Sequence, residues 1–237
     1  MPIDLEAYAR VMGDYYDKRI DPAQDKSSQG YAEEYDRNYA TEGHWARELA
    51  IAIQEYLAGR RVMEIAAGTG QWTRYLVRTA RFVQASDVTE RALSRLEKVV
   101  RHAQEIPTGR FEVVRLDAYR PDEAPGEFDA ALIVNFFQHI PRQQHDDFIT
   151  RLHRRLPSGG RVLLAINHLS PRSRARLFSN PGDPNLWEPR QTFDGRPADI
   201  IDNVFSEPDL RELFGPYARE FNFFCGIGYY WICYELR

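Results

Sequence analysis

The sequence has few of the features that mark secreted or membrane proteins. Only two of its 237 residues are cysteine, Cys225 and Cys233, and no apolar stretch approaches the roughly 18 residues that a membrane span needs. Two nearby cysteines in a hydrophobic segment indicate neither a disulfide framework nor a metal site. We interpret both as buried thiols in a reducing cytoplasm.

An excess of positive charge is also lacking. The chain has 31 Lys and Arg against 35 Asp and Glu, a net charge of -4, so it lacks the positive field on which binding to a phosphate backbone relies. The first residues carry charge from the fourth position onward and form no apolar signal segment. We therefore expect an unprocessed cytoplasmic protein, a monomer or homodimer, that binds neither nucleic acid nor membrane.

What the sequence does have is enough apolar material for one substantial core. It is 43% hydrophobic and contains 13 Phe, 13 Tyr and 4 Trp. Between residues 46 and 57, apolar side chains recur at steps of three and four, which predicts a helix. We divide the chain into a helical lid at residues 1–58 and a core at residues 59–237, within a single structural domain.

From residue 61 onward, short apolar runs alternate with longer amphipathic ones, a pattern typical of β-strands that alternate with α-helices. A capped helix at 206–214 and a tight hairpin around Gly226-Ile-Gly228 follow. These features predict an α/β, Rossmann-like, mostly parallel seven-stranded sheet with helices on both faces and an antiparallel hairpin at its end. The predicted strands are 62–66, 82–85, 111–116, 130–134, 162–166, 221–225 and 229–234, and the helices between them are 71–78, 90–102 and 143–156.

Residues 167–204 interrupt this rhythm with five prolines and five arginines. A segment of this length without clear periodicity is usually a functional loop, so we interpret it as a substrate lid. Trp187 is our candidate substrate contact within it.

The most informative segment runs from Val62 to Gly70, a strand that leads into a glycine turn and a helix. Glycines allow a ligand to approach the backbone closely. A dinucleotide fingerprint would need glycine or alanine where Thr73 stands, and no Gly-Lys-Ser/Thr phosphate loop is present.

This segment resembles the acidic-x-Gly-x-Gly-x-Gly signature of class I S-adenosylmethionine (SAM)-dependent methyltransferases, of the small-molecule type. The resemblance covers about residues 60–167, with alanine in the place of the first glycine, and the terminal hairpin also fits it. It implies that the turn holds the methionine part of SAM and that the acid lies near its amino group. A cationic sulfonium ligand requires carboxylates, whereas a pyrophosphate requires cations. The residues concerned are Glu64, Ala66, Gly68 and Gly70.

Two more acids follow the next two predicted strands. Asp87, beside Val88, has the spacing of a carboxylate that accepts hydrogen bonds from a ribose diol, although it also suits a helix N-cap. The resemblance assigns Asp117 to the adenine amino group and Ala118 to a ring nitrogen, although Asp also ends many strands as a turn residue. Three acids at the ends of three successive strands, on the side where open α/β sheets bind ligands, support the cofactor site more strongly than any one alone.

The fourth strand leads into Asn135-Phe-Phe-Gln-His139, where the resembled family lines its methyl-transfer site. We assign Asn135 and Phe136 to the cofactor, and Phe137 and His168 to the substrate. Asn135 is followed by Phe136 and Phe137, so both prolines of the Asn/Asp-Pro-Pro-aromatic motif of nucleic-acid and protein-glutamine methyltransferases are missing. If a general base is used, His139 is the best candidate, with packing or helix capping as an equal alternative.

Tyrosines of the predicted lid suit a cover for a cationic cofactor, although they also suit simple packing. Among them we select Tyr16 for the cofactor and Tyr35 for the substrate. The sequence thus predicts transfer of a methyl group from SAM to an oxygen or nitrogen atom of a small aromatic or amine metabolite, without a metal. The alternatives are methylation of RNA or protein, a nicotinamide-dependent reductase and a non-catalytic cofactor-binding scaffold.

Overall fold

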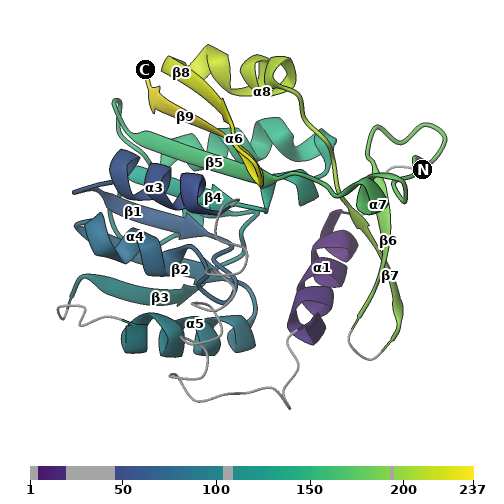
Figure 1. Cartoon of the computed structure of the whole chain (residues 1–237), viewed down its shortest axis with the longest axis horizontal. Coiled ribbons are helices and arrows are strands. Elements are labelled where there is room, and N and C mark those ends of the chain that lie inside the picture. Colours follow the sequence, from purple (N-terminus) through teal and green to yellow (C-terminus); the bar gives the residue numbers. More distant parts are fainter. Residues whose placement is uncertain (1–4, 20–45, 104–108, 193–194) are drawn as a thin grey trace.

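The computed structural model describes residues 5–19, 46–103, 109–192 and 195–237. Its centre is a seven-stranded sheet in the order β3-β2-β1-β4-β5-β9-β8, in which β1 to β5 are parallel and β9 and β8 antiparallel. Figure 1 shows this order from β8 at the top to β3 at the bottom. The strands are β1 (Arg61–Ile65), β2 (Phe82–Asp87), β3 (Phe111–Arg115), β4 (Ala130–Val134), β5 (Arg161–Asn167), β8 (Ala218–Cys225) and β9 (Tyr229–Leu236).

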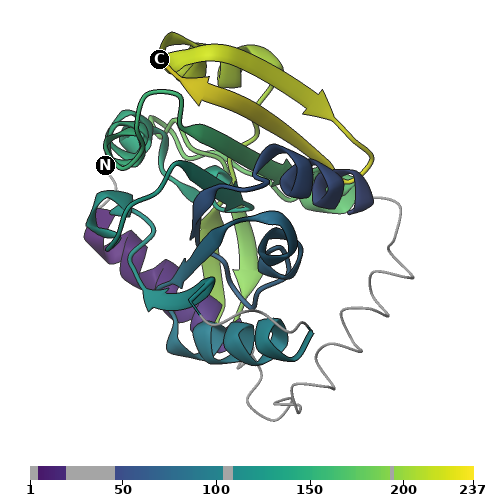
Figure 2. The same ribbon diagram turned by 90° about the vertical axis from the view of Figure 1, so that its left-hand side faces the viewer.

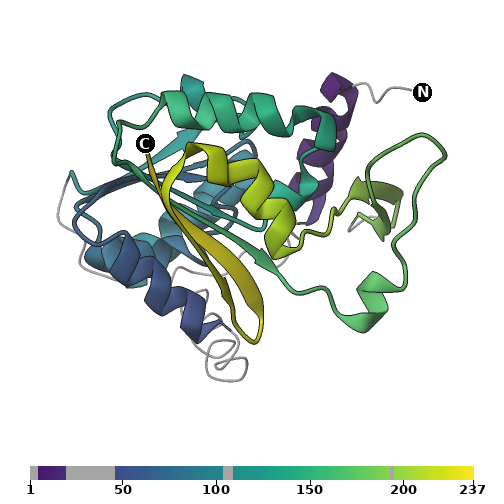
Figure 3. The ribbon, with the colours of Figure 1, turned by 90° about the horizontal axis from the view of Figure 1, so that it is seen from above.

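Helices cover both faces of the sheet, because strands of a parallel sheet bury side chains on both sides. One face packs against α3, α4 and α5, and the other against α6 and α8. Figure 3 shows α3 and α6 on opposite sides of the sheet. The fold predicted from the sequence is confirmed. The helix bounds are α3 (Arg47–Tyr56), α4 (Thr73–Thr79), α5 (Glu90–Ala103), α6 (His145–Arg154) and α8 (Glu207–Phe214).

The helix α3 lies within the region that the sequence assigned to a lid, yet it is part of the sheet's own packing. Its buried residues Leu49, Ala50 and Ile53 belong to the same apolar cluster as the sheet residues Val62 and Leu163. The amphipathic pattern of residues 46–57 therefore reflects a helix that covers the central strands.

The segment 167–204 is more ordered than its irregular sequence indicated. After α7 (Pro171–Arg174), it forms a two-stranded antiparallel sheet of β6 (Trp187–Gln191) and β7 (Pro197–Ile201). This hairpin stands apart from the main sheet, beside helix α1 (Leu5–Arg19), as Figures 1 and 2 show.

Helix α1 and this hairpin share a small apolar cluster of their own. Tyr8, Met12 and Tyr15 of the helix pack with Ile200 and Ile201 of β7, and all five are buried. The hairpin therefore buries its apolar side chains against the N-terminal helix.

The two cysteines differ in environment, which corrects one interpretation. Cys233 is buried on β9, and burial raises the pKa of its thiol to about 12. Cys225 is exposed, because it lies on β8 at the edge of the sheet. Both thiols are free.

Candidate functional site

The turn after β1 is fastened to the neighbouring strand β2. The backbone N–H of Ala67 donates to the carbonyl of Ser86 at 2.8 Å, and the N–H of Gly68 donates to Oδ2 of Asp87 at 3.0 Å. Three residues of the turn have positive φ angles: 53° at Ala66, 57° at Gly68 and 87° at Gly70. The turn is a fixed platform at the carboxyl edge of the sheet.

The two glycines of the turn have different roles. Gly68 lines a large cavity, and a Cβ atom there would meet nothing within 4 Å, so its constraint is the left-handed φ. At Gly70 a Cβ atom would lie 3.0 Å from Cγ of Leu96 on α5. Gly70 therefore permits close packing of α5 and is absent from the cavity wall.

Glu64, at the carboxyl end of β1, is a buried acid without a counter-ion among the described residues. Its side chain lines the cavity, and its Oε2 atom has no hydrogen-bond partner in the described part of the chain. Burial raises the pKa of this carboxyl to about 8. A cationic group in the cavity would supply the missing partner, so Glu64 fits the ammonium group of SAM.

Asp87, at the end of β2, uses both carboxylate oxygens to organise the backbone. Besides the Gly68 N–H bound to Oδ2, the backbone N–H and hydroxyl of Thr89 donate to Oδ1 at 2.9 and 3.0 Å. The sequence left open whether Asp87 is the N-cap of the next helix. Because α5 begins at Glu90, Asp87 lies before the N-cap position. The neighbouring Val88 is 40% exposed and also lines the cavity.

Asp117 and Ala118 follow β3 in the same wall. The Oδ1 atom of Asp117 accepts a hydrogen bond from the N–H of Tyr119 at 3.0 Å, the geometry of an Asx turn. Asp117 therefore acts as a turn residue, which was the alternative that the sequence left open. The other carboxylate oxygen is the atom left for the predicted contact with the adenine amino group.

These positions surround one cavity of about 1110 Å³. Sites for a single drug-sized ligand usually occupy about 300–1,000 Å³, so this volume accommodates a cofactor together with a small acceptor. The strand ends of the main sheet form its floor, and α1 contributes Arg10, Met12, Gly13 and Tyr16. All the predicted cofactor residues apart from Gly70 line it: Glu64, Ala66, Gly68, Asp87, Val88, Asp117, Ala118, Asn135, Phe136 and Tyr16.

At the end of β4, the backbone is held in an uncommon conformation. Asn135 has a φ of 57°, and its Oδ1 atom accepts a hydrogen bond from the N–H of Asn167 at 2.9 Å. A non-glycine residue in this region carries a conformational cost, which persists where surrounding contacts fix it. The cross-link joins the ends of β4 and β5 within the cavity wall.

His139 lies in the wall at this end, in a short 3-10 turn (Phe137–His139), and is 4% exposed. Its Nδ1 atom lies 2.6 Å from the carbonyl oxygen of Ile201 on β7. A carbonyl only accepts, so Nδ1 carries the hydrogen, and in a neutral ring Nε2 is then the basic nitrogen. This arrangement is compatible with a general base.

Gln138 was not selected from the sequence, yet it is a buried polar residue of the same wall. Its Nε2 atom lies 3.4 Å from Oδ1 of Asn167, whereas Oε1 has no hydrogen-bond partner in the described part of the chain. In the sequence, only its position next to the candidate base His139 could have indicated that Gln138 belongs to the site. A three-residue turn has no periodicity that reveals which side chain faces a cavity.

Two of the predicted substrate residues do not line the cavity. Phe137 is fully buried and stacks on His145 with a centroid separation of 4.6 Å, so it belongs to the core and not to the wall. Trp187 is also absent from the wall, because its indole N–H donates to Asp183 at 2.7 Å and its ring packs on Tyr8. Tyr35 lies outside the described residues.

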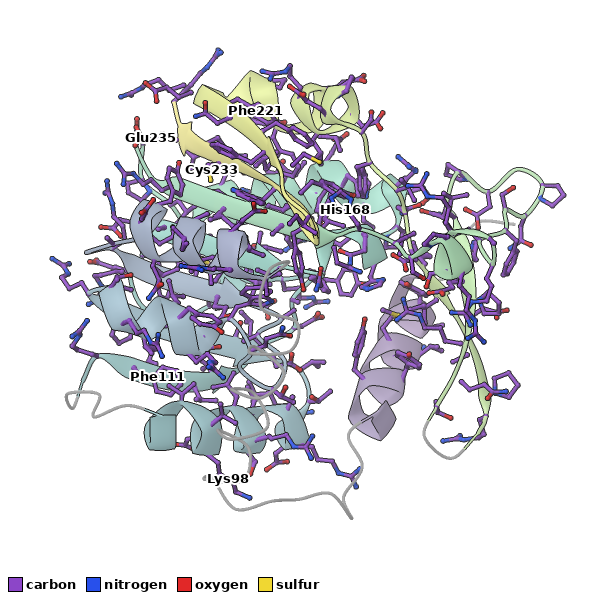
Figure 4. The ribbon with its side chains drawn as sticks, in the orientation of Figure 1. Lys98, Phe111, His168, Phe221, Cys233 and Glu235 are labelled. Atoms are coloured by element: carbon purple, nitrogen blue, oxygen red, sulfur yellow. The ribbon has the colours of Figure 1, made fainter. Side chains whose placement is uncertain are left out.

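His168, the fourth, does line the cavity, at the end of β5 where the chain leaves the main sheet (Figure 4). Its Nε2 atom lies 3.0 Å from the carbonyl of Gly226 in the β8–β9 hairpin. The side chain therefore joins the mouth of the cavity to the hairpin tip.

Arg190 of β6 also reaches the cavity wall, backed by two buried acids. Its Nε atom lies 2.6 Å from Glu188 and its terminal nitrogen lies 3.0 Å from Asp202. Although burial opposes it, hydrogen bonds from Arg190 and Arg176 lower the pKa of Glu188, whereas burial raises the pKa of Asp202 to about 6. The charge of Arg190 is therefore largely balanced within the hairpin.

Among the described residues, no group of three or more His, Cys, Asp or Glu side chains is arranged to hold a metal ion. None of the described helices has both the length and the apolar character that crossing a bilayer requires.

The chain was compared with known families and proteins. Residues 62–160 match the model of a methyltransferase domain family. A demethylmenaquinone methyltransferase from Tropheryma whipplei is 29% identical over 138 residues, which are 56% of this chain and 54% of that protein. The chain thus spans about half the length of the curated relatives it matches.

Solved structures resemble the whole chain. A DhpI-SAM-HEP complex has a TM-score of 0.68 at 20% identity, covering 98% of this chain and 99% of that one. A 1,6-didemethyltoxoflavin-N1-methyltransferase from Burkholderia thailandensis, with 1,6-didemethyltoxoflavin and S-adenosylhomocysteine bound, has a TM-score of 0.55 at 19% identity, covering 100% and 92%. The family match agrees with the methyltransferase class that the sequence predicted, and two structural neighbours that share the fold contain SAM or S-adenosylhomocysteine.

Proposed function

Because residues 62–160 match a methyltransferase domain family, we propose that the protein transfers the methyl group of SAM to an oxygen or nitrogen atom of a small molecule. The observation that carries the proposal is the single cavity that extends from Glu64 and the glycine turn to His139. Cofactor residues and a candidate base thus line one continuous cavity.

The cofactor half of the cavity provides what SAM requires. Glu64 supplies a buried carboxylate for the ammonium group, Gly68 allows close approach of the backbone, and Asp87 is placed for the ribose. When bound, SAM supplies a methyl carbon that its sulfonium group activates. The protein's task is then to place the acceptor atom in line with that carbon and to exclude water.

The acceptor half has a different polarity. Beyond Phe136, the described wall residues come from the turn after β4, the end of β5, the hairpin strand β6 and the β8–β9 tip, and none of them is acidic. Arg190 of β6 is a cation in this part of the wall, and Glu188 and Asp202 balance its charge. An acceptor without a positive charge, such as an aromatic hydroxyl or ring nitrogen, fits this half better than a cationic amine does.

His139 would take the proton that leaves a hydroxyl or N–H acceptor. Its Nδ1–H is directed to the carbonyl of Ile201, so the proton would reach Nε2. Helix α1 contributes to the cavity wall, and we propose that it acts as a lid. Such a lid would limit the acceptor to a small molecule. The neighbour that carries bound 1,6-didemethyltoxoflavin supports a small-molecule acceptor in this fold.

Calorimetric titration with SAM, S-adenosylhomocysteine and NADH tests this proposal. We expect micromolar binding of the two sulfur nucleosides and no binding of NADH. A screen of phenols, carboxylic acids and aromatic nitrogen compounds, followed by mass spectrometry for a methyl increment, then identifies the acceptor. Binding of NADH alone would refute the proposal. Binding of SAM without transfer to any acceptor would indicate a non-catalytic scaffold.

A further inference from the structure

One buried hydroxyl joins three parts of the molecule that are distant in sequence. The hydroxyl of Tyr8 on α1 accepts a hydrogen bond from the N–H of Ile201 on β7 at 3.0 Å. The same hydroxyl donates to the carbonyl oxygen of His139 at 3.2 Å. Tyr8 is only 6% exposed, and its ring packs edge-on against Trp187 with centroids 5.7 Å apart.

Ile201 is bound to both partners at once. Its N–H is held by Tyr8, and its carbonyl oxygen lies 2.6 Å from Nδ1 of His139. Ile201 is the last residue of β7, and directly after it the N–H of Asp202 donates to the carbonyl of Leu186 at 2.9 Å, which holds the peptide group that carries the Ile201 carbonyl. Tyr8 adds a hydrogen bond to the N–H of Ile201 and another to the carbonyl of His139, so it ties together the two residues whose contact orients the imidazole.

We propose that Tyr8 is a positioning residue that holds Ile201 against His139 and so keeps the imidazole hydrogen on Nδ1. Docking of α1, which contributes four residues to the cavity wall, thereby also sets the orientation of the candidate base. This inference rests on the proposed function for the use of the base, whereas the geometry of the ring can be measured without any substrate.

A second tyrosine provides a matched control. The hydroxyl of Tyr119 also donates to the carbonyl oxygen of His139, at 3.3 Å, but no hydrogen bond links it to Ile201. Removing either hydroxyl deprives His139 of one donor. Only removal of the Tyr8 hydroxyl leaves the N–H of Ile201 without its acceptor, which is costly for a buried group.

The test is nitrogen-15 NMR of the histidine rings in the full-length wild-type, Tyr8→Phe and Tyr119→Phe proteins, at a pH where the imidazole is neutral. The His139 signal is assigned by its loss in His139→Gln. We expect the wild type and Tyr119→Phe to show hydrogen on Nδ1, and Tyr8→Phe to show a several-fold increase in the form with hydrogen on Nε2. The amide of Ile201 should exchange faster with solvent only in Tyr8→Phe.

An unchanged ring in Tyr8→Phe would overturn the proposal, and so would an equal change in Tyr119→Phe. If Tyr8→Phe does not fold, a fluorinated tyrosine at this position keeps the volume and weakens the hydroxyl as an acceptor. The same shift, in smaller measure, is then expected, and its absence would overturn the proposal. Failure of the wild type to bind SAM would instead refute the proposed function and leave the NMR result intact.

Discussion

The Oδ2 atom of Asp87 accepts a hydrogen bond from the backbone N–H of Gly68 at 3.0 Å. The acid at the end of β2 is therefore attached to the glycine turn at the end of β1. A substitution of Asp87 affects both a predicted ribose contact and the shape of the turn that would hold the methionine part of SAM.

For Asp87→Ala, we expect binding of SAM to weaken by about 1–3 kcal/mol, from loss of charge-assisted hydrogen bonds. This corresponds to roughly a 5- to 150-fold increase in Kd by calorimetry. Thr89→Val is the control, because it removes only a hydroxyl bound to Oδ1 and leaves the Gly68 contact in place. Unchanged affinity in Asp87→Ala would mean that Asp87 serves the backbone alone.

Burial of Glu64 makes stability depend on pH. Its pKa is about 8 in the folded protein and near 4.5 when unfolded, so between these values the folded state holds a proton that the unfolded state releases. Stability therefore falls as pH rises through this window, with a slope of about 1.4 kcal/mol per pH unit for one group. We expect urea denaturation to show this loss in the wild type without ligand, and a smaller one in Glu64→Gln.

The same group should respond to the cofactor. An ammonium group beside Glu64 favours the ionised carboxylate, so SAM binding near pH 7 should release a proton. Calorimetry in buffers of different ionisation enthalpy measures this release, which should vanish in Glu64→Gln. Equal release from both proteins would show that Glu64 does not contact the ammonium.

Ala66 stands in a left-handed conformation, with a φ of 53°. This region costs a non-glycine residue roughly 1–2 kcal/mol, whereas glycine loses about 0.4–1 kcal/mol through the greater freedom of the unfolded chain. Ala66→Gly should therefore stabilise the protein by up to about 1.6 kcal/mol in urea denaturation. Ala67→Gly, where φ is not positive, should destabilise it. The opposite order would mean that Ala66 is not strained.

Substitution of Gln138 should affect protein stability and acceptor binding differently. Oε1 is buried without a partner among the described residues, so Gln138→Met should leave stability unchanged or raise it by about 1 kcal/mol. If Oε1 accepts a donor from the acceptor molecule, the same substitution should raise KM for the acceptor and leave the SAM affinity unchanged.

Asn203 serves as the control for Gln138, because it is a buried amide side chain whose hydrogen bonds are made. Its amide donates to the carbonyl of Ile140 at 3.2 Å and accepts from the N–H of Leu186 at 3.0 Å. Asn203→Ala should therefore destabilise the protein by about 1–3 kcal/mol. Similar losses of stability in both variants would show that the Gln138 side chain is satisfied in the folded protein.

As a general base, His139 should affect turnover more than binding. With an acceptor found by the screen, His139→Gln should lower kcat about 100- to 10,000-fold and leave the Kd of SAM nearly unchanged. His145→Gln is the matched control, because His145 is buried, lies 3.1 Å from the carbonyl of Ile140 and is absent from the cavity wall. It should lose stability and retain turnover per folded molecule. Parallel losses of stability and turnover in His139→Gln would indicate packing.

The sequence by itself determined the main sheet and predicted where the cofactor site would lie. Strands and helices have hydrophobic periods that are local properties of the chain, so the alternation from residue 61 onward was enough to predict the fold. The positions of the glycine turn and of the acids at the ends of β1 and β2 were predictable for the same reason, because the carboxyl ends of parallel strands lie at one edge. The capped helix was equally local: Ser206 and Asp209 form a reciprocal capping box within one turn.

Only the tertiary structure decided the acceptor end. Tyr8 and Ile201 lie 193 positions apart in sequence, and their contact exists because α1 packs on a hairpin whose strands contain prolines and charges instead of an alternating pattern. The same packing directs Trp187 toward Tyr8, away from the cavity. In the turn after β4, Phe137 faces the core while Gln138 and His139 reach the cavity, because side-chain direction in so short a turn depends on neighbours that are remote in the chain.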